Sequence, residues 1–592
     1  VRLSAAMQTE EAVHRQFDAL ARAPKQLALL MKYIELSGWT GEKKELKEVS
    51  RKTLLDSAGV TNAVLNGLIG KGVFEIYSFE IGRLSAEQVS VSPLNPLSSA
   101  QQQAYSEILT HFHQKNVCLL HGVTASGKTE IYIHLIQQAI QAGKQVLYLL
   151  PEIALTTQIT ERLKRVFGNR LGIYHSKFPD AERVEIWRKQ LTDDDYDVIL
   201  GVRSSVFLPF RRLGLVIVDE EHENTYKQQD PAPRYHARNA AIVLASMFGA
   251  KTLLGTATPC IETYYNAVHG KYGWVQLTER HQNVLLPHIE VVDIKELARK
   301  KRMTAQFSPL LLVSLTYHKN LGQLTCHYCG YTYEVPKSCP ACGGVELINR
   351  GFGTEKIEDD IKLIFPDARV ARMDLDTTRT RTAYERIIAD FEDGKTDILI
   401  GTQMVSKGLD FDRVSVVGIL NADSMMNYPD FRSYERAFQL MAQVAGRAGR
   451  KNKQGLVVLQ TKSPDLPLIA QVVSNDYGGL FQSQIEERNL FKYPPFFRLI
   501  YVYLKHRKEE VLDQAADLMA GYLRNGLGSR VLGPDRPPVS RIQTLFIKKI
   551  VVKIEQQASM SKVREYLQQV QRAIVEDERF RSLLVYYDVD PM

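Results

Sequence analysis

Short, continuously apolar runs alternate with helix-like segments along most of the chain after residue 116. Strands that are apolar throughout are typical of a parallel sheet that helices cover on both faces. The first set of predicted strands covers residues 117–120, 145–150, 198–200, 215–218 and 252–254, and a second set covers residues 397–400, 414–420 and 455–460. The pattern therefore predicts two α/β lobes that follow one another along the chain.

The first segment, residues 7–84, is rich in helix-forming residues. It leads through a glycine-punctuated stretch, residues 67–72, into a strand-like run at residues 73–77. Short helices followed by a hairpin-like end are typical of a winged-helix module, and a generic helical domain fits the pattern equally well. Residues 90–98 contain two prolines among small polar residues, which is the composition of a linker.

These segments divide the chain into four predicted domains. They are a winged-helix-like domain at residues 4–84, a first lobe at 92–285, a second lobe at 286–462 with a cysteine-rich insertion at about 313–345, and an α+β C-terminal domain at 463–592. A length of 592 residues agrees with this division, because domains average roughly 150 residues.

Composition limits the class of protein. No apolar run reaches the roughly 18 residues of a membrane-spanning helix, and the first residues lack the apolar core of a signal peptide. We therefore expect a cytoplasmic protein with no membrane partner. The net charge of +8 suits a polyanionic partner such as nucleic acid, although many proteins without such a partner are as basic.

Candidate chemistry begins with a glycine-rich loop, residues 122–129, whose sequence GVTASGKT matches the phosphate-loop pattern GxxxxGK[ST]. It follows an apolar strand and precedes a helix-like segment, as such a loop requires. Gly122 and Gly127 let backbone N–H groups close around phosphates at a helix N-terminus. We expect Lys128 to reach the β- and γ-phosphates of ATP and the Thr129 hydroxyl to bind Mg²⁺.

A carboxylate-rich segment, residues 219–222 with the sequence DEEH, comes directly after the predicted strand at 215–218. A carboxylate at the end of a buried strand can hold the Mg²⁺ shell while its neighbour polarises the attacking water. We expect Asp219 to be the metal-binding residue and Glu220 the general base. In isolation such a cluster is commonly a solvated acidic turn, but the phosphate loop upstream on the same sheet favours the catalytic role.

A third segment, residues 443–450 with the sequence QVAGRAGR, lies in the second lobe. Arg447 and Arg450 are three residues apart, so we expect them to share one helix face and to neutralise charge on the γ-phosphate. Gln443 is expected at the nucleotide as well. Because this segment and the phosphate loop lie in different lobes, hydrolysis would depend on lobe closure. Without the other two segments, two arginines on a helix would indicate a solvated face.

Taken in order, these segments resemble the motifs of superfamily-two helicases. Residues 97–103 resemble the adenine-contacting segment, with Gln101 in the matching position. The other matches are motif I at residues 122–129, Ia at 151–156, Ib at 201–205, II at 219–222, III at 255–259, V at 401–408 and VI at 443–450. The resemblance implies that Arg203 in motif Ib and Lys407 in motif V couple DNA to the nucleotide site.

Three further features resemble the PriA family of replication-restart helicases. The first is an aromatic-rich loop, residues 226–238, which in that family couples single-stranded DNA to the ATP site; Tyr235, His236 and Arg238 lie in it. Rings that stack on bases beside an arginine that holds phosphate suit this task. The second feature is the cysteine-rich insertion. The third is a set of short signatures at residues 351–355, 374–378 and 588–591.

The resemblance to PriA implies an ATP-dependent 3′–5′ DNA helicase that recognises and remodels stalled or abandoned replication forks and initiates primosome assembly. The implied partners are forked and single-stranded DNA, other primosome proteins and single-stranded-DNA-binding protein. The implied location is the cytoplasm, in association with the nucleoid. The implied cofactors are ATP, Mg²⁺ and Zn²⁺.

Four of the six cysteines form two C-x-x-C pairs, Cys326 with Cys329 and Cys339 with Cys342. Clustered pairs in an intracellular chain indicate metal binding, and two pairs can give one Zn²⁺ four thiolate ligands. The PriA family, however, carries four such pairs that hold two zinc ions in an interleaved pattern. By that pattern the two pairs of this chain belong to different zinc ions, so the resemblance implies two zinc sites.

Parts of the family pattern have no counterpart in this chain. The first two cysteine pairs and a helicase strand that ends in an Asn-Arg-Arg-Gly-like sequence are absent before the insertion. We expect residues to be missing between Leu312 and Val313, which an ordinary chain connection there would contradict, and a second gap near residues 543–546. The family's N-terminal domain, which binds a 3′ DNA end, also has no counterpart, so the numbering need not be native.

Two alternatives remain open at the level of sequence. A different superfamily-two ATPase, such as an RNA helicase or a restriction or remodelling translocase, would share the fold and the ATP chemistry. A structural adaptor with a degenerate ATP site would share only the fold. The DEEH sequence, the aromatic-rich loop and the cysteine-rich insertion favour PriA, and the complete set of ATP-site residues argues against an adaptor.

Overall fold

The structure is a computed structural model of the chain, which divides into two compact units, Val1–Ser85 and Ala86–Met592. It describes all residues except 5–6, 8–9, 39–48, 50, 76–91, 152–156, 176–178, 281–285, 304–305, 314–323, 326–331, 334–352, 375, 379, 403–413 and 450–453.

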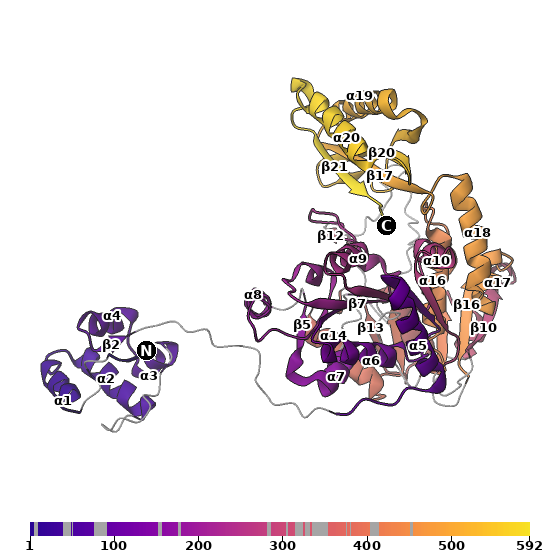
Figure 1. The fold of residues 1–592 in the computed structure, drawn as a ribbon. Coiled ribbons are helices and arrows are strands. Elements are labelled where there is room, and N and C mark those ends of the chain that lie inside the picture. The colour runs from indigo at the N-terminus through magenta and orange to yellow at the C-terminus, as the bar shows by residue number, and fades with distance from the viewer. Residues whose placement is uncertain are drawn as a thin grey trace. The chain divides into compact units, whose positions relative to one another are not determined.

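The first unit combines short helices with a small antiparallel sheet (Figure 1). Its helices are α1 (Glu10–Ala19), α2 (Pro24–Ser37), α3 (Arg51–Ala58) and α4 (Asn62–Gly70). Directly after α4, β2 (Phe74–Glu75) pairs with β1 (Arg2–Leu3). Leu29 of α2, Leu65 of α4 and Phe74 are all buried in one hydrophobic core, which fixes the pair of strands against the helices.

Lobe 1 is built on seven parallel strands in the order β5-β6-β4-β7-β8-β3-β9. They are β3 (Val117–Gly122), β4 (Gln145–Leu149), β5 (Leu171–Tyr174), β6 (Val198–Gly201), β7 (Leu213–Asp219), β8 (Lys251–Thr256) and β9 (Gly273–Leu277). All five predicted strands form here. The two that the pattern did not indicate, β5 and β9, lie at the two edges of the sheet.

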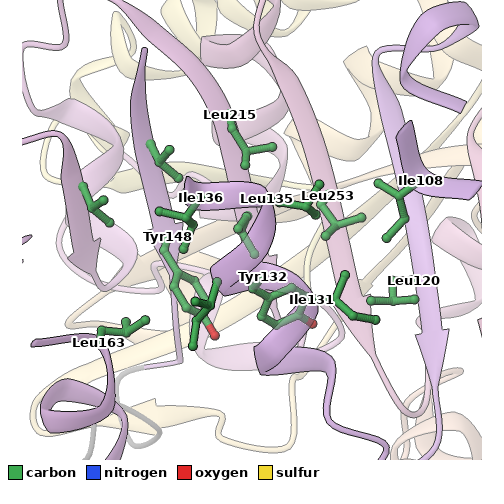
Figure 2. Close-up of a cluster of buried hydrophobic side chains, with 14 of the residues drawn as sticks. Ile108, Leu120, Ile131, Tyr132, Leu135, Ile136, Tyr148, Leu163, Leu215 and Leu253 are labelled. Atoms are coloured by element: carbon green, nitrogen blue, oxygen red, sulfur yellow. The ribbon is translucent and has the colours of Figure 1, made fainter. Parts of the chain in front are cut away.

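Helices cover both faces of this sheet. They are α5 (Ser99–Gln114), α6 (Lys128–Gln141), α7 (Thr157–Phe167), α8 (Asp180–Lys189), α9 (Ala237–Met247) and α10 (Ile261–Val268). On one face, Ile131 of α6 and Leu163 of α7 pack with Leu120 of β3 in a fully buried cluster (Figure 2). Tyr132 of α6 and Tyr148 of β4 lie in the same cluster and bring two hydroxyl groups into an otherwise apolar core (Figure 2).

Lobe 2 contains a three-stranded parallel sheet and a separate parallel pair. The three strands are β10 (His288–Asp293), β16 (Leu456–Thr461) and β15 (Val416–Ile419), and the pair is β13 (Val370–Met373) with β14 (Ile398–Gly401). The helices are α11 (Ile294–Arg299), α12 (Pro309–Val313), α13 (Thr354–Ile364), α14 (Arg381–Glu392), α15 (Asp423–Met426) and α16 (Ser433–Ala445). Within the insertion, β11 (Leu324–Thr325) pairs with β12 (Thr332–Tyr333).

Two helices, α17 (Pro467–Ser474) and α18 (Tyr477–Leu490), lead into the C-terminal domain. Its antiparallel sheet has the order β18-β20-β17-β21, and β19 pairs with β20. The strands are β17 (Phe497–His506), β18 (Val531–Asp535), β19 (Arg541–Ile542), β20 (Leu545–Glu555) and β21 (Leu584–Val589). The helices α19 (Glu509–Leu527) and α20 (Met560–Val575) lie along this sheet (Figure 1). Their apolar side chains share one buried core with the strands.

The two positions at which we expected missing residues lie at the end of α12 and between β19 and β20. Helix α12 continues through Leu312 to its last residue, Val313. Residues 543–544 form the turn between β19 and β20, with Gln543 at a φ of 53°. The expectation of missing residues at these two places stays a prediction. No helix within the described part of the chain combines the length and the apolar character that crossing a membrane requires.

Candidate active site

The phosphate loop connects the end of β3 to the start of α6, so Gly122 ends the strand while Lys128 and Thr129 begin the helix. Gly127 precedes the helix with a φ of 82°, a conformation that glycine adopts without steric cost. An added Cβ at Gly122 would lie 2.9 Å from Ser126 Oγ and 3.1 Å from Lys128 Cγ. The Lys128 ammonium donates a hydrogen bond of 2.9 Å to the Gly122 carbonyl oxygen. The loop is therefore closed tightly around its own lysine.

Gln101 supports the phosphate loop from α5. Its side-chain amide donates to the carbonyl oxygens of Ser126 at 3.3 Å and Gly127 at 3.4 Å. Its Oε1 accepts a 2.9 Å hydrogen bond from the N–H of Ser98, and the two residues form a capping box at the start of the helix. The structure thus brings Gln101 to the phosphate loop, and its contact with adenine stays a prediction.

Asp219 ends β7, and its carboxylate accepts hydrogen bonds from the two core tyrosines. The Tyr132 hydroxyl lies 2.9 Å from Oδ1 and the Tyr148 hydroxyl lies 3.3 Å from Oδ2. Burial, reinforced by the charge of Glu220, raises the pKa of Asp219 to about 6, while the Lys128 ammonium acts in the opposite direction. Because burial disfavours the ionised carboxylate, a cation placed beside it would be favoured.

These groups fit a nucleotide with Mg²⁺. The Ser126 hydroxyl in the phosphate loop is buried and has no hydrogen-bond partner among the described residues. A buried polar atom without a partner costs free energy, which a ligand at the loop would offset. The partly buried carboxylate of Asp219 and the helix N-terminus at Lys128 supply the complementary charges for a metal ion and for phosphate.

The rest of motif II is tied to motif III. Glu220 has a φ of 46°, a strained conformation for a residue with a side chain. His222 Nδ1 lies 2.7 Å from Thr256 Oγ1, at the end of β8. Glu221 is fully buried and accepts a hydrogen bond of 2.8 Å from the N–H of Cys260. Motif II can therefore pass a change in position to the segment that follows β8.

Arg238 lies inside lobe 1. Its guanidinium contacts the Glu221 carboxylate at 2.6 Å, and the residue is only 7% exposed. We expected Arg238 in DNA coupling, as an arginine that holds phosphate. In this structure it links the aromatic-rich loop to motif II, and a direct phosphate contact would require it to leave a buried carboxylate.

Motif VI lies at the end of α16, whose last turn carries Gln443. The helix ends at Ala445, so Arg447 lies in the following turn. The prediction of a shared helix face does not hold for Arg447, because the helix is capped at Gly446, before Arg447. Arg450 itself lies outside the described residues. Burial lowers the pKa of Arg447 to about 10, and the charge of Glu220 opposes this shift, so the guanidinium is within electrostatic reach of motif II.

Arg280, which the sequence did not single out, joins the phosphate loop to motif VI. Its Nε donates to the carbonyl oxygen of Thr124 at 3.1 Å, and its Nη2 donates to that of Gly446 at 3.1 Å. An added Cβ at Gly446 would lie 2.8 Å from the Cβ of Thr124, so the motif VI turn packs directly on the phosphate loop. No motif marks Arg280, and only its contacts reveal this link between the lobes.

A buried cluster of four charges forms a second link between the lobes. Glu262 of α10 contacts Arg432 at 2.5 Å and Arg488 of α18 at 3.3 Å. Arg488 also contacts Glu435 of α16 at 2.5 Å. The other carboxylate oxygen of Glu435 accepts a hydrogen bond of 2.9 Å from the N–H of Ile261, at the start of α10. The segment after motif III is thus held by α16 and by the helix that leads to the C-terminal domain.

A cavity of about 380 Å³ lies between motif II and lobe 2. His222 and Glu223 line it from lobe 1, and Gln439 and Gln443 line it from α16. It is separate from the phosphate loop, none of whose residues line it. The structure therefore brings Gln443 to the boundary between the lobes, and its contact with nucleotide stays a prediction.

The aromatic-rich loop is a hairpin that starts beside motif II. Lys227 and His236 form an antiparallel bridge at its base. The buried hydroxyl of Tyr226 donates to the carbonyl oxygen of Asp219 at 2.7 Å. Arg203, at the start of the short helix Arg203–Phe207, donates to the carbonyl oxygen of Lys227 at 3.1 Å and accepts a 3.2 Å hydrogen bond from the Tyr235 hydroxyl. Motif Ib, the loop and motif II therefore form one connected group.

His236 has an unusual environment within this loop. The residue is 8% exposed, and neither ring nitrogen has a hydrogen-bond partner in the part of the chain that the structure describes. Burial, aided by the charges of Arg238 and Lys227, lowers its pKa well below the usual value, so the ring is neutral. Buried polar atoms without partners are rare in native proteins and often mark functional positions.

Several predicted residues lie outside the described residues. They are Lys407 of motif V, most of motif Ia, and all four paired cysteines, Cys326, Cys329, Cys339 and Cys342. Among the described residues, no group of three or more His, Cys, Asp or Glu side chains is arranged to hold a metal ion.

The short signatures at residues 351–355 and 374–378 contact each other, because the Thr354 hydroxyl donates a 2.6 Å hydrogen bond to the Asp374 carboxylate.

Family descriptions match most of the chain. They are "Winged helix domain, PriA helicase, Bacteroidota" at residues 1–81, "DEAD/DEAH box helicase" at 98–266, "PriA DNA helicase Cys-rich region (CRR) domain" at 313–333, "Helicase conserved C-terminal domain" at 353–452 and "Primosomal protein N C-terminal domain" at 489–592. The replication restart protein PriA of Bacillus subtilis is 34% identical over 627 aligned positions, which cover 98% of this chain and 77% of that protein. The chain belongs to the PriA family. The PriA of Haemophilus influenzae is 36% identical, over 90% of this chain and 78% of that protein.

Membership of the PriA family decides between the alternatives left open by the sequence. The chain is an ATP-dependent DNA helicase of replication restart that uses a nucleotide and Mg²⁺, and neither an RNA helicase nor an adaptor. The first unit is a winged-helix domain, as one of the two interpretations predicted. Among solved structures, RecG bound to a three-way DNA junction is 16% identical, with a TM-score of 0.39, over 80% of this chain and 54% of that chain.

Two details of the matches concern the insertion. The match to the Cys-rich region includes Cys326 and Cys329 but ends before Cys339. The alignment with the Bacillus subtilis protein is longer than the chain itself, so that relative carries residues with no counterpart here. PriA relatives are therefore longer than this chain within the aligned region, as missing residues would require.

Proposed function

We propose that ATP with Mg²⁺ binds between the lobes of this PriA helicase and that closure of lobe 2 on the phosphate loop completes the catalytic site. The contact of the motif VI turn with Thr124, bridged by Arg280, is the observation that carries this proposal. It means that an arginine from lobe 2 can act on a phosphate held by lobe 1.

Each residue of the site has a separate task in this proposal. Lys128 and Thr129 hold the phosphates at the start of α6, and Asp219 holds Mg²⁺, which would neutralise charge on the β- and γ-phosphates. Glu220 accepts a proton from the attacking water. Arg447, together with Arg450, stabilises the charge that develops during phosphoryl transfer. Gln101 and Gln443 complete the nucleotide site from α5 and α16.

The aromatic-rich loop would couple DNA to this site. The hydrogen bond from Tyr226 to the backbone of Asp219 gives the loop a direct connection to the metal-binding residue. Arg203, Tyr235, His236 and Lys407 would then respond to single-stranded DNA, while Arg238 would transmit the response through Glu221. We propose that each cycle moves the lobes along one DNA strand in the 3′–5′ direction.

Zinc binding by the insertion rests on its cysteines. Thiolate pairs of this spacing suit Zn²⁺, and the match to the PriA Cys-rich region supports a zinc site there. We propose that the pair Cys326 and Cys329 and the pair Cys339 and Cys342 serve two different zinc ions. The insertion would separate DNA strands or dock partner proteins.

The cellular setting follows from the family. We propose that the helicase recognises stalled or abandoned forks, initiates primosome assembly and works in the cytoplasm on nucleoid DNA. Other primosome proteins and single-stranded-DNA-binding protein would be its partners.

The test measures ATP hydrolysis and strand separation on forks that carry single-stranded gaps in the leading or the lagging arm, with zinc measured in the same preparation. We expect both activities on DNA forks, with a dependence on which arm carries the gap, and bound zinc. Equal activity on all forks would contradict fork recognition. Unwinding only of duplexes with a 5′ single-stranded tail would contradict the polarity.

A further inference from the structure

The signature at the end of the chain, residues 588–591, has no role in the site described so far. Asp588 and Val589 end β21, and Asp590 follows at a φ of 48°. The backbone N–H of Asp590 donates to the Leu499 carbonyl oxygen at 2.8 Å, and its carboxylate contacts Arg498 at 2.6 Å. Both of these partners lie on β17, so the end of the chain is held firmly against the C-terminal sheet.

Lys227 of the aromatic-rich loop inserts into this chain end. Its ammonium lies 2.7 Å from the Asp588 carboxylate, 2.8 Å from the carbonyl oxygen of Val589 and 3.4 Å from that of Asp590. The side chain of Lys227 is 1% exposed and that of Asp588 is 7% exposed. Figure 1 marks the C-terminus between the C-terminal sheet and α9, the helix that follows the aromatic-rich loop.

The contact between Lys227 and the chain end lies at the base of the loop, beside the residue that is bonded to motif II. Tyr226, the residue before Lys227, is anchored to the backbone of Asp219, and Lys227 itself forms the base of the hairpin with His236. Two consecutive residues thus connect motif II on one side and the C-terminal domain on the other. A second contact follows at the tip, where the Arg234 guanidinium lies 4.2 Å from the centre of the Tyr586 ring on β21.

We propose that the chain end at Asp588–Asp590 is the docking point of the aromatic-rich loop, and that Lys227 is the positioning residue through which the C-terminal domain controls the stimulation of ATP hydrolysis by DNA. A lysine whose ammonium is surrounded by three oxygens of one segment has little freedom to move, so the base of the loop follows the C-terminal domain. The inference rests on the proposed coupling function of the loop.

The experiment compares the DNA-stimulated and DNA-free ATPase rates of the full chain with those of Asp588→Asn, Lys227→Met and the double variant. We expect Asp588→Asn to lower the ratio of the two rates about tenfold, the size expected for losing one buried charged contact, with KM for ATP unchanged. The double variant should show the same loss as Asp588→Asn alone. Additive losses, or an unchanged ratio in folded Asp588→Asn, would overturn the proposal.

The double variant separates control of the loop from simple stability. Asp588→Asn alone leaves a lysine buried without its carboxylate, whereas removing both charges is often neutral for folding. If the pair served only to stabilise the fold, the double variant would regain both thermal stability and DNA stimulation, which would refute the proposal. The proposal expects it to regain stability without stimulation.

Two further arms complete the design. Arg530→Met removes an exposed ion pair of 2.8 Å with Glu555, also in the C-terminal domain, and should leave the ratio unchanged. Tyr235→Ala tests the coupling function itself. If Tyr235→Ala keeps full stimulation, the function proposed for the loop fails; if it loses stimulation while Asp588→Asn keeps it, only the docking proposal fails.

Discussion

Arg280 in lobe 1 donates a hydrogen bond of 3.1 Å to the carbonyl oxygen of Gly446 in motif VI. The same guanidinium holds the Thr124 carbonyl of the phosphate loop. One side chain therefore holds the loop that binds phosphate beside the turn that carries Arg447.

Replacing Arg280 with Met should lower kcat for ATP hydrolysis. Each hydrogen bond from a charged donor contributes roughly 1.5–3 kcal/mol, so losing the two that hold the turn to the loop should lower kcat about 100-fold or more. Steady-state kinetics at saturating DNA measure the effect. Arg299→Met, at the exposed end of α11, is the matched control and should leave kcat unchanged. An unchanged kcat in Arg280→Met would show that the spacing is set by other contacts.

Asp219→Asn should abolish catalysis but stabilise the protein without nucleotide and metal. The pKa of Asp219 in the fold is about 6, above its ordinary value of 3.8, so ionisation in the fold is unfavourable. The free-energy cost of keeping Asp219 ionised in the fold is fully present above pH 6 and disappears as the pH falls towards 4. We therefore expect thermal unfolding at pH 8 to show a gain of up to about 3 kcal/mol, and a smaller gain at pH 5.

Asp397→Asn should change the stability in the opposite direction, because the pKa of Asp397 is lowered in the fold and that of Asp219 is raised. The Arg369 side chain lowers the pKa of Asp397 to about 2, so the ionised carboxylate stabilises the fold above the unfolded pKa near 3.8, and this contribution is lost as the pH falls towards 2. Removing it should lower the unfolding temperature at pH 8. A destabilised Asp219→Asn variant at pH 8 would contradict the account of its burial.

His236→Phe should separate stability from DNA coupling. Phe removes two buried nitrogens that have no partner among the described residues, so the free energy of unfolding should rise by about 1 kcal/mol. If those nitrogens gain partners when DNA binds, the stimulation of ATP hydrolysis by DNA should fall. Full stimulation in a stable His236→Phe variant would mean that the ring serves only to fill the core.

Arg488→Met should destabilise the lobe interface. The substitution leaves Glu262 and Glu435 buried with one arginine between them, and breaking a buried ion pair in this way costs about 3–5 kcal/mol. Thermal unfolding is the measurement. The double variant with Glu435→Gln should recover part of the loss, and the absence of any recovery would show that Arg488 acts mainly through Glu262.

The elements that could be predicted from the sequence are those whose residues are contiguous along the chain. The phosphate loop and motif II are contiguous, and the strands before them are apolar because the sheet is covered on both faces. The edge strands β5 and β9 are as long as β6 and β4, but they are not buried along their whole length, so their apolar patterns are weaker. Motif VI was recognised, but spacing alone could not reveal that Gly446 ends the helix before Arg447.

The contacts between elements could not be predicted in the same way. Arg280, Arg488 and Lys227 act through partners more than fifty residues away, and no pattern around them distinguishes them from surface charges. Arg238 was recognised by its place in the aromatic-rich loop, yet the sequence did not show that Glu221 holds it inside the lobe. Such pairs become visible only when the packing is known.

The most direct test of the central claim is ATP hydrolysis by Lys128→Ala, with DNA affinity measured on the same preparation. We expect no hydrolysis above background, with or without DNA, and unchanged binding of forked DNA, because the ammonium of Lys128 lies at the phosphate loop. Full turnover in this variant would contradict the assigned nucleotide site.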